Sequence, residues 1–135
     1  MKRNFIGYGK EKPKLFWPDG NKLAISIVVN IEEGAELSVS SGDNENEHIY
    51  ENNKTKISNN ITDLCMESHY EYGLRSGIWR IFNLFDEYKI KATFSCCSRA
   101  LERSPWLINE ILNRKHEISA HGVKWISHAL SLIHI

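Results

Sequence analysis

The feature that most constrains the fold is an apolar run without alternation over residues 23–29, with two acidic residues at positions 32 and 33 shortly after it. Its Ile and Val content and its lack of a polar side predict a strand buried on both faces, as in a parallel sheet. Glu32 and Glu33 come directly behind that strand. Because α/β folds gather functional groups at the carboxyl ends of their strands, the pair is a candidate site, with a solvated loop as the alternative.

Helical and strand patterns alternate along the rest of the chain. The predicted elements are a helix over residues 75–88, a strand over 90–97, a helix over 104–115 and a strand over 116–120. Apolar residues at helical spacing predict the buried faces Ile78, Ile81, Phe82 and Phe85 for the first helix, and Leu107, Ile108, Ile111 and Leu112 for the second. This order is typical of right-handed parallel crossovers and predicts an α/β fold.

Parallel strands bring the residues that follow them to one rim of the sheet. The groups expected there are Glu32, Glu33, Cys96, Cys97 and His121. A carboxylate beside a histidine can activate water for attack on a carbonyl, or hold a divalent metal if a third ligand joins. The two cysteines are expected to be small buried residues with reduced thiols rather than nucleophiles.

Two segments flank the predicted core. Residues 1–22 carry prolines, glycines and aromatic residues and are expected to form an irregular arm. A polar insertion covers residues 35–63, which is far longer than an ordinary connection and therefore either a functional lid or a disordered segment. Its polar composition favours disorder for residues 42–60.

Charge and hydropathy limit the classes of partner and the location that we expect for this protein. Seventeen Lys and Arg balance seventeen Asp and Glu, which gives no reason to expect nucleic acid or an anionic membrane surface as a partner. The first ten residues lack the apolar segment of a signal peptide, and no apolar run reaches the ~18 residues of a membrane span. A cytoplasmic location is therefore expected.

Five segments carry a family resemblance: residues 5–9, 29–34, 66–73, 75–80 and 121–125. Residues 30–34 resemble the Thr-Phe-Asp-Asp-Gly motif of polysaccharide deacetylases with the NodB-homology domain, and residues 119–125 resemble the histidine motif of that family. The amino-acid sequences of the five segments are similar to those of the allantoinases of purine catabolism that share this deacetylase-like fold.

The resemblance implies that residues 23–126 are part of a distorted (β/α) barrel of the polysaccharide deacetylase type. By position, Glu32 takes the role of catalytic base, while Glu33 and His121 take those of the first metal ligands. Trp125 stands where the family has its second histidine, and an indole cannot coordinate a metal. The expectation is therefore that no cofactor is required, with zinc as the alternative.

The implied activity is hydrolysis of a carbon–nitrogen bond other than a peptide bond, in a cyclic ureide such as allantoin. Glu32 would activate the water, and His121 would orient it or protonate the leaving nitrogen. Glu67 and Trp125 are expected to line the substrate site, whereas Tyr70, Tyr72 and Trp79 are expected to pack. The alternatives are N-deacetylation of an acetylated sugar or peptidoglycan, and a non-catalytic binding protein derived from the barrel.

Chain length sets a further expectation. Barrels of this type need ~200 residues or more, so the resemblance implies an N-terminal fragment that is inactive and poorly soluble by itself, and homo-oligomers for the full-length protein. Residues 127–135 leave the family pattern, and residues 131–135 resemble a translated sequencing adapter, so this tail is expected to be non-native. His128 is expected to be a surface residue.

Overall fold

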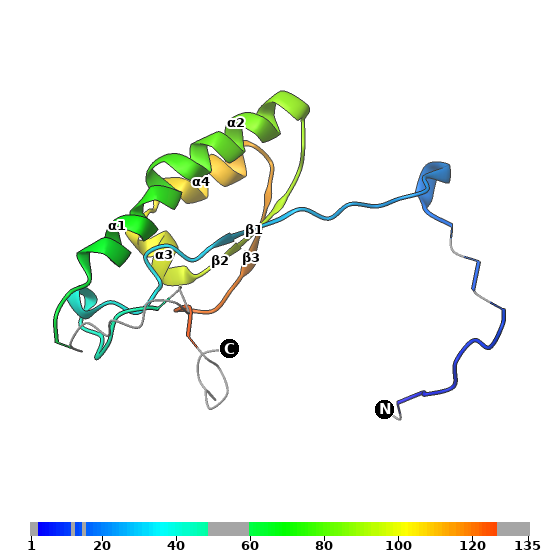
Figure 1. The fold of residues 1–135 in the computed structure, drawn as a ribbon. Helices are drawn as coiled ribbons and strands as arrows, with labels where there is room; N and C mark the ends of the chain where they lie inside the picture. The colour runs from blue at the N-terminus through cyan, green and yellow to red at the C-terminus, as the bar shows by residue number, and fades with distance from the viewer. Residues whose placement is uncertain (1–2, 12, 15, 49–59, 127–135) are drawn as a thin grey trace.

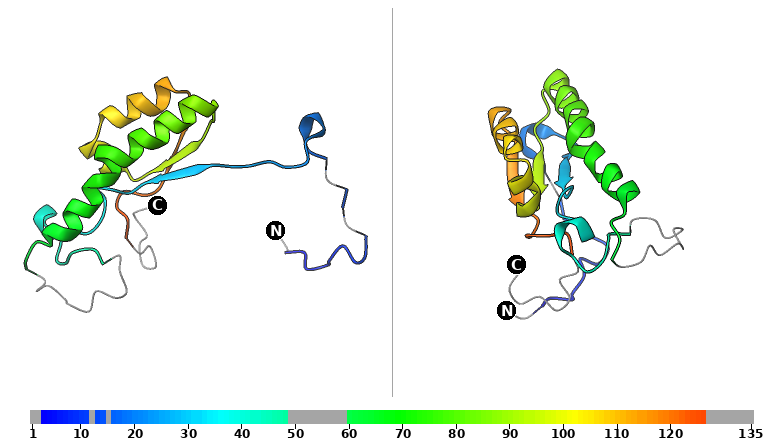
Figure 2. Two further views of the ribbon diagram at one scale, coloured as in Figure 1. Left: turned by 45° about the horizontal axis from the view of Figure 1, so that its top comes forward. Right: turned by 90° about the vertical axis from the view of Figure 1, so that its left-hand side faces the viewer.

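The computed structural model describes residues 3–11, 13–14, 16–48 and 60–126. Its strands are β1 (Val28–Ile31), β2 (Thr93–Cys96) and β3 (Glu117–Ala120). Its helices are α1 (Leu64–Tyr72), a π-helical turn (Gly73–Gly77), α2 (Ile78–Tyr88), α3 (Ser98–Arg103) and α4 (Trp106–Asn113), with 3-10 turns at Pro18–Gly20 and Val39–Ser41. Figures 1 and 2 show α2 and α4 along one face of the sheet.

The three strands form one parallel sheet in the order β1-β2-β3. Ile31 pairs with Cys96, and Cys96 pairs with Ala120, so the strands end at the same level. The α/β class and the parallel polarity predicted from the sequence are therefore confirmed. A closed barrel is not among the described elements, which supply three strands.

The prediction that β1 is buried on both faces is wrong. Ile31 is 2% exposed, but Val28 is 55% exposed, and Leu23 and Ile25 lie outside the strand and are exposed as well. Successive strand residues point to opposite faces, and the helices cover only one of them. The strand also starts later than predicted, because its pairing with β2 starts at Val28.

The core lies between the sheet and the helices. Ile78, Phe82 and Phe85 of α2 are buried, as the helical spacing predicted. In α4, Leu107 is buried, but the prediction that Leu112 faces the core is wrong, because it is 53% exposed. The buried core members are Ile31, Ala35, Ile78, Phe82, Phe85, Ala92, Phe94, Cys96, Cys97, Ala100, Leu107 and Ile111.

The helix predicted over residues 75–88 starts earlier than its apolar pattern indicates. The described chain is helical from α1 through the π-helical turn into α2. Asp63 caps the start of α1, where its side chain accepts hydrogen bonds from the backbone N–H groups of Cys65 and Met66 at 3.1 Å each. The sequence pattern missed α1 because this helix buries only Met66.

The two flanking segments differ in their contacts. The arm extends away from the sheet in Figures 1 and 2, with Phe5 and Phe16 exposed. In the insertion, Ser38 and Asn46 are buried, and the Asn46 side chain accepts a hydrogen bond from Val39 and donates one to Ile61. The disorder prediction is therefore wrong for residues 42–48.

Several predictions fall outside the described residues. These concern residues 49–59 of the insertion and residues 127–135, including His128. Within the described ranges, no helix combines the length and the apolar character that crossing a membrane requires.

Candidate functional site

The structure brings Glu32 and His121 into contact at the carboxyl rim of the sheet. The Oε1 atom of Glu32 lies 2.9 Å from Nε2 of His121. The two side chains are 26% and 35% exposed, so water reaches both. Glu32 follows β1 and His121 follows β3, which are the outer strands of the described sheet. The contact therefore joins groups 89 positions apart in the sequence.

Backbone hydrogen bonds just beyond the strand ends hold the two residues in place. The N–H of His121 donates to the carbonyl of Cys96, and the N–H of Cys97 donates to the carbonyl of Ile31, each at 2.9 Å. Behind Glu32 the chain turns at Gly34, which has a φ of 91° in the left-handed region that favours glycine. The rim geometry thus follows from the sheet register and this turn.

Glu33, the second acid of the pair, occupies different surroundings. Its carboxylate lies against the π-helical turn, and its Oε2 accepts a hydrogen bond from the backbone N–H of Glu32 at 3.3 Å. Burial raises the pKa of Glu33, although backbone hydrogen bonds act in the opposite direction. Two adjacent carboxylates therefore have two different environments, one with His121 and one against a helix.

A metal site does not assemble from the described residues. Among them, no three His, Cys, Asp or Glu side chains lie close enough together to hold a metal ion. Nε2 of His121 is paired with Glu32, while Glu33 lies against the helix. Trp125 is 42% exposed and contributes a backbone hydrogen bond to Ala35. The predicted pairing of Glu33 and His121 as metal ligands therefore does not fit this donor set.

Besides a cavity of about 90 Å³ that borders Glu33, two hollows adjoin the acid pair. The smaller, about 270 Å³, is lined by Asn30, Glu32, Glu33, His69, Tyr70, Tyr72 and Gly73. The larger, about 470 Å³, lies between the insertion and the helices and is lined by residues that include Glu36, Glu67 and Arg103. Neither hollow is lined by Trp125, which was expected to contact substrate. Of these hollows among the described residues, the one of about 270 Å³ borders Glu32, so we take it as the candidate substrate position.

Tyr70 is a site residue that sequence reasoning assigned to packing. It lines both hollows, whereas Trp79 does pack as expected, stacked on Trp106 with ring centroids 5.1 Å apart. Burial, followed by nearby carboxylates such as Glu47 and Glu36, raises the pKa of the Tyr70 hydroxyl. This hydroxyl stays protonated and can donate a hydrogen bond to a ligand. Its position one helical turn after Glu67 is the signal that could have placed it at the site.

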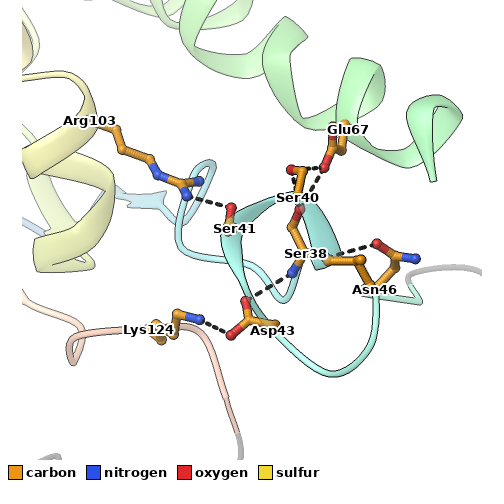
Figure 3. A network of polar contacts seen from close by, with 9 residues as sticks. Ser38, Ser40, Ser41, Asp43, Asn46, Glu67, Arg103 and Lys124 are labelled. Atoms are coloured by element: carbon orange, nitrogen blue, oxygen red, sulfur yellow. Dashed lines mark hydrogen bonds and ion pairs between the residues drawn. The ribbon is translucent and has the colours of Figure 1, made fainter. Parts of the chain in front are cut away.

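Glu67 anchors the insertion to α1. Its Oε1 atom accepts hydrogen bonds from the hydroxyls of Ser38 and Ser40 (Figure 3). It lines the larger hollow and is absent from the lining of the smaller one beside Glu32, so its expected position at the substrate site stays a prediction. In Figure 3, two further contacts hold the same segment, from Arg103 to Ser41 and from Lys124 to Asp43.

The cysteines at the rim are buried thiols. Cys96 is 3% exposed and Cys97 is fully buried. Burial raises the pKa of Cys96 to about 11 and also raises the pKa of Cys97. Because a thiol reacts as its thiolate, neither group is suited to act as a nucleophile. The prediction of small buried residues is confirmed.

Two solved structures are similar to this chain in fold and in sequence. The crystal structure of Puue allantoinase matches with a TM-score of 0.81 and 36% sequence identity, over 97% of this chain and 44% of that chain. The crystal structure of a protein described as "probable Polysaccharide deacetylase" from Pseudomonas aeruginosa PAO1 matches with the same TM-score and 34% identity, again over 97% and 44%.

Sequence comparison gives a consistent assignment. A curated protein of Schizosaccharomyces pombe (strain 972 / ATCC 24843) named "Putative polysaccharide deacetylase" is 34% identical over 114 residues, which are 83% of this chain and 36% of that protein. The chain thus spans less than half the length of each of these relatives. The family model described as polysaccharide deacetylase matches residues 60–131. The chain belongs to the polysaccharide deacetylase family.

Proposed function

We propose that the full-length protein hydrolyses a carbon–nitrogen bond, other than a peptide bond, in a cyclic ureide such as allantoin. The observation that carries the proposal is the 2.9 Å contact between Glu32 and His121 beside a hollow of about 270 Å³. A carboxylate held by a histidine at the edge of a cavity is an arrangement suited to general acid–base chemistry. The similarity to the allantoinase structure supports a ureide as substrate.

The proposed reaction uses one water and both side chains. Glu32 accepts a proton from a water molecule whose oxygen attacks a ring carbonyl carbon of the ureide. The ring carbon–nitrogen bond then breaks, and the leaving nitrogen takes a proton delivered through Glu32 or His121. The product is an open chain with a carboxylate and a free amide nitrogen, so one water is consumed. Tyr70 lines the hollow, and in the proposed reaction its hydroxyl would bind a polar group of the substrate.

The second candidate is N-deacetylation of an acetylated sugar. The name of the Schizosaccharomyces pombe relative and that of the Pseudomonas aeruginosa structure favour it. In that reaction a bound zinc ion would polarise the acetyl carbonyl. The side chains available as metal ligands favour the ureide, because Trp125 stands at the second histidine position and an indole cannot coordinate zinc.

Chelation separates the two candidates. The complete gene product would be assayed with allantoin and with N-acetylated sugars, before and after treatment with a chelator. We expect ureide hydrolysis that survives chelation. Activity on acetylated sugars that disappears with the chelator and returns with zinc would instead establish the deacetylase.

Glu32→Gln tests the base assignment in either reaction. The variant keeps the size of the side chain but cannot accept the proton, and we expect kcat to fall by about 10²- to 10⁴-fold. Glu87→Gln, at an exposed position of α2, serves as the matched control and should keep the parent rate. Unchanged turnover in Glu32→Gln would exclude Glu32 as the base. A complete gene product with no turnover of either substrate would favour the non-catalytic binding protein.

A further inference from the structure

The Glu33 carboxylate occupies space that a side chain at Gly73 would fill. A Cβ atom built on Gly73 would lie 3.0 Å from Cγ and 2.6 Å from Cδ of Glu33, and closer still to Oε1. Real Cβ atoms are essentially never found that close to a heavy atom. The backbone of Gly73 has φ −55° and ψ −55°, an ordinary helical conformation that every residue adopts. Glycine is therefore needed at this position for the room that its missing side chain leaves, and not for backbone flexibility.

The neighbouring glycine of the same turn shows that this requirement is local. A Cβ built on Gly77 would meet Tyr72 Cε1 at 3.5 Å, an ordinary van der Waals contact. Gly77 also has helical dihedral angles. Both glycines weaken the helix relative to alanine, and only Gly73 has a carboxylate in the position of the missing side chain.

Glu33 lines both hollows, and its neighbour Glu32 makes the contact with His121. Two carboxylates adjacent in sequence repel each other, so an arrangement that keeps them in separate environments needs a place for the second one. The π-helical turn supplies that place at Gly73. Single π-helical turns are frequent at functional sites.

We infer that Gly73 is a positioning residue: its missing side chain forms the niche that holds the Glu33 carboxylate at the wall shared by the two hollows. The niche is inferred from distances and does not depend on the proposed function; only its effect on turnover rests on that function. The end of the Glu33 side chain is flexible, so a methyl group at Gly73 displaces the carboxylate from this position.

The first test measures thermal stability in the complete gene product and needs no substrate. Gly77→Ala should raise the Tm by roughly 2 °C, because alanine favours the helix. Gly73→Ala should raise it by less or lower it, since the methyl group displaces Glu33. In the Glu33→Ala background, Gly73→Ala should recover the full rise. Equal rises for Gly73→Ala with and without the Glu33 side chain would overturn the inference.

Failure of Gly73→Ala to fold is also decisive. If the Glu33→Ala/Gly73→Ala double variant then folds, the Glu33 side chain is the cause and the niche is supported. If the double variant fails as well, the requirement for glycine has another origin and the inference is wrong.

The second test measures turnover in the complete gene product. Gly73→Ala should lower kcat at least tenfold, Gly77→Ala should not, and Gly73→Ala should have no further effect in the Glu33→Ala background. Independent, multiplicative losses would mean that Gly73 does not act through Glu33 and would overturn the inference. If the parent protein turns over neither substrate, the proposed function fails, and the stability comparison alone decides the role of Gly73.

Discussion

At the scale of single residues, the site depends on how two adjacent acids are divided. Glu32 faces His121 at 2.9 Å, whereas Glu33 lies in the niche beside Gly73, where burial raises its pKa. Neighbouring residues of a chain leave the backbone in different directions, so this division needs no long-range rearrangement. The chemistry assigned to Glu32 therefore depends on where Glu33 is held.

His116 makes stability dependent on pH. It is 6% exposed, its Nδ1 atom accepts a hydrogen bond from the N–H of Ala92 at 3.3 Å, and its ring lies among aromatic rings including Phe94 at 5.1 Å. Burial, followed by the charge of Lys91, lowers its pKa from the ordinary value of 6.5. Because the folded state then binds the proton less readily than the unfolded state, stability is complete above pH 6.5 and is lost as the pH falls through the lowered pKa.

We therefore expect the free energy of unfolding of the complete gene product, measured by urea titration from about pH 8 to about pH 5, to decline below the ordinary histidine pKa. His116→Gln keeps an acceptor for the Ala92 N–H but does not titrate, so its decline should be shallower. Identical pH profiles for the parent and His116→Gln would contradict this origin.

At the scale of elements, the start of α1 fixes the wall of both hollows. The Asp63 side chain satisfies two N–H groups of the first turn, at Cys65 and Met66. We expect Asp63→Ala to lower the free energy of unfolding of the complete gene product by about 1 kcal/mol, as measured by denaturant titration. Asp63→Asn keeps a capping oxygen and should retain most of the stability. An equal loss in both variants would show that the charge, not the cap, is what matters.

At the scale of the whole molecule, the described sheet has one helix-covered face and one open face. Leu23, Ile25 and Val28 are exposed apolar residues on or next to β1. Exposed apolar surface beside sheet edges favours self-association. We expect the chain alone to associate with rising concentration, as seen by light scattering, and Leu23→Lys/Ile25→Lys to raise the concentration at which association starts. A monodisperse, cooperatively unfolding chain with hydrolase activity would contradict this expectation.

Much of the fold was predictable because local patterns report it directly. The spacing of Ile78, Phe82 and Phe85 identified the buried face of α2, and the alternation of elements implied parallel strands with a common rim. The parallel direction of the strands was enough to predict that Glu32 and His121 lie near each other. The weaker predictions failed where burial depends on neighbours: Val28 has no covering layer, and Leu112 lies off the buried stripe of α4.

The sequence by itself determined the alternation of strands with the longer helices, the buried face of α2 and the family, since these follow from periodicity and motifs carried by consecutive residues. Only the tertiary structure decided that Glu33 lies against Gly73, that Tyr70 lines both hollows and that Glu67 binds the insertion. Each of these contacts joins segments far apart in the chain. Their distances depend on how a helix is placed over a sheet edge, and no local pattern records that placement.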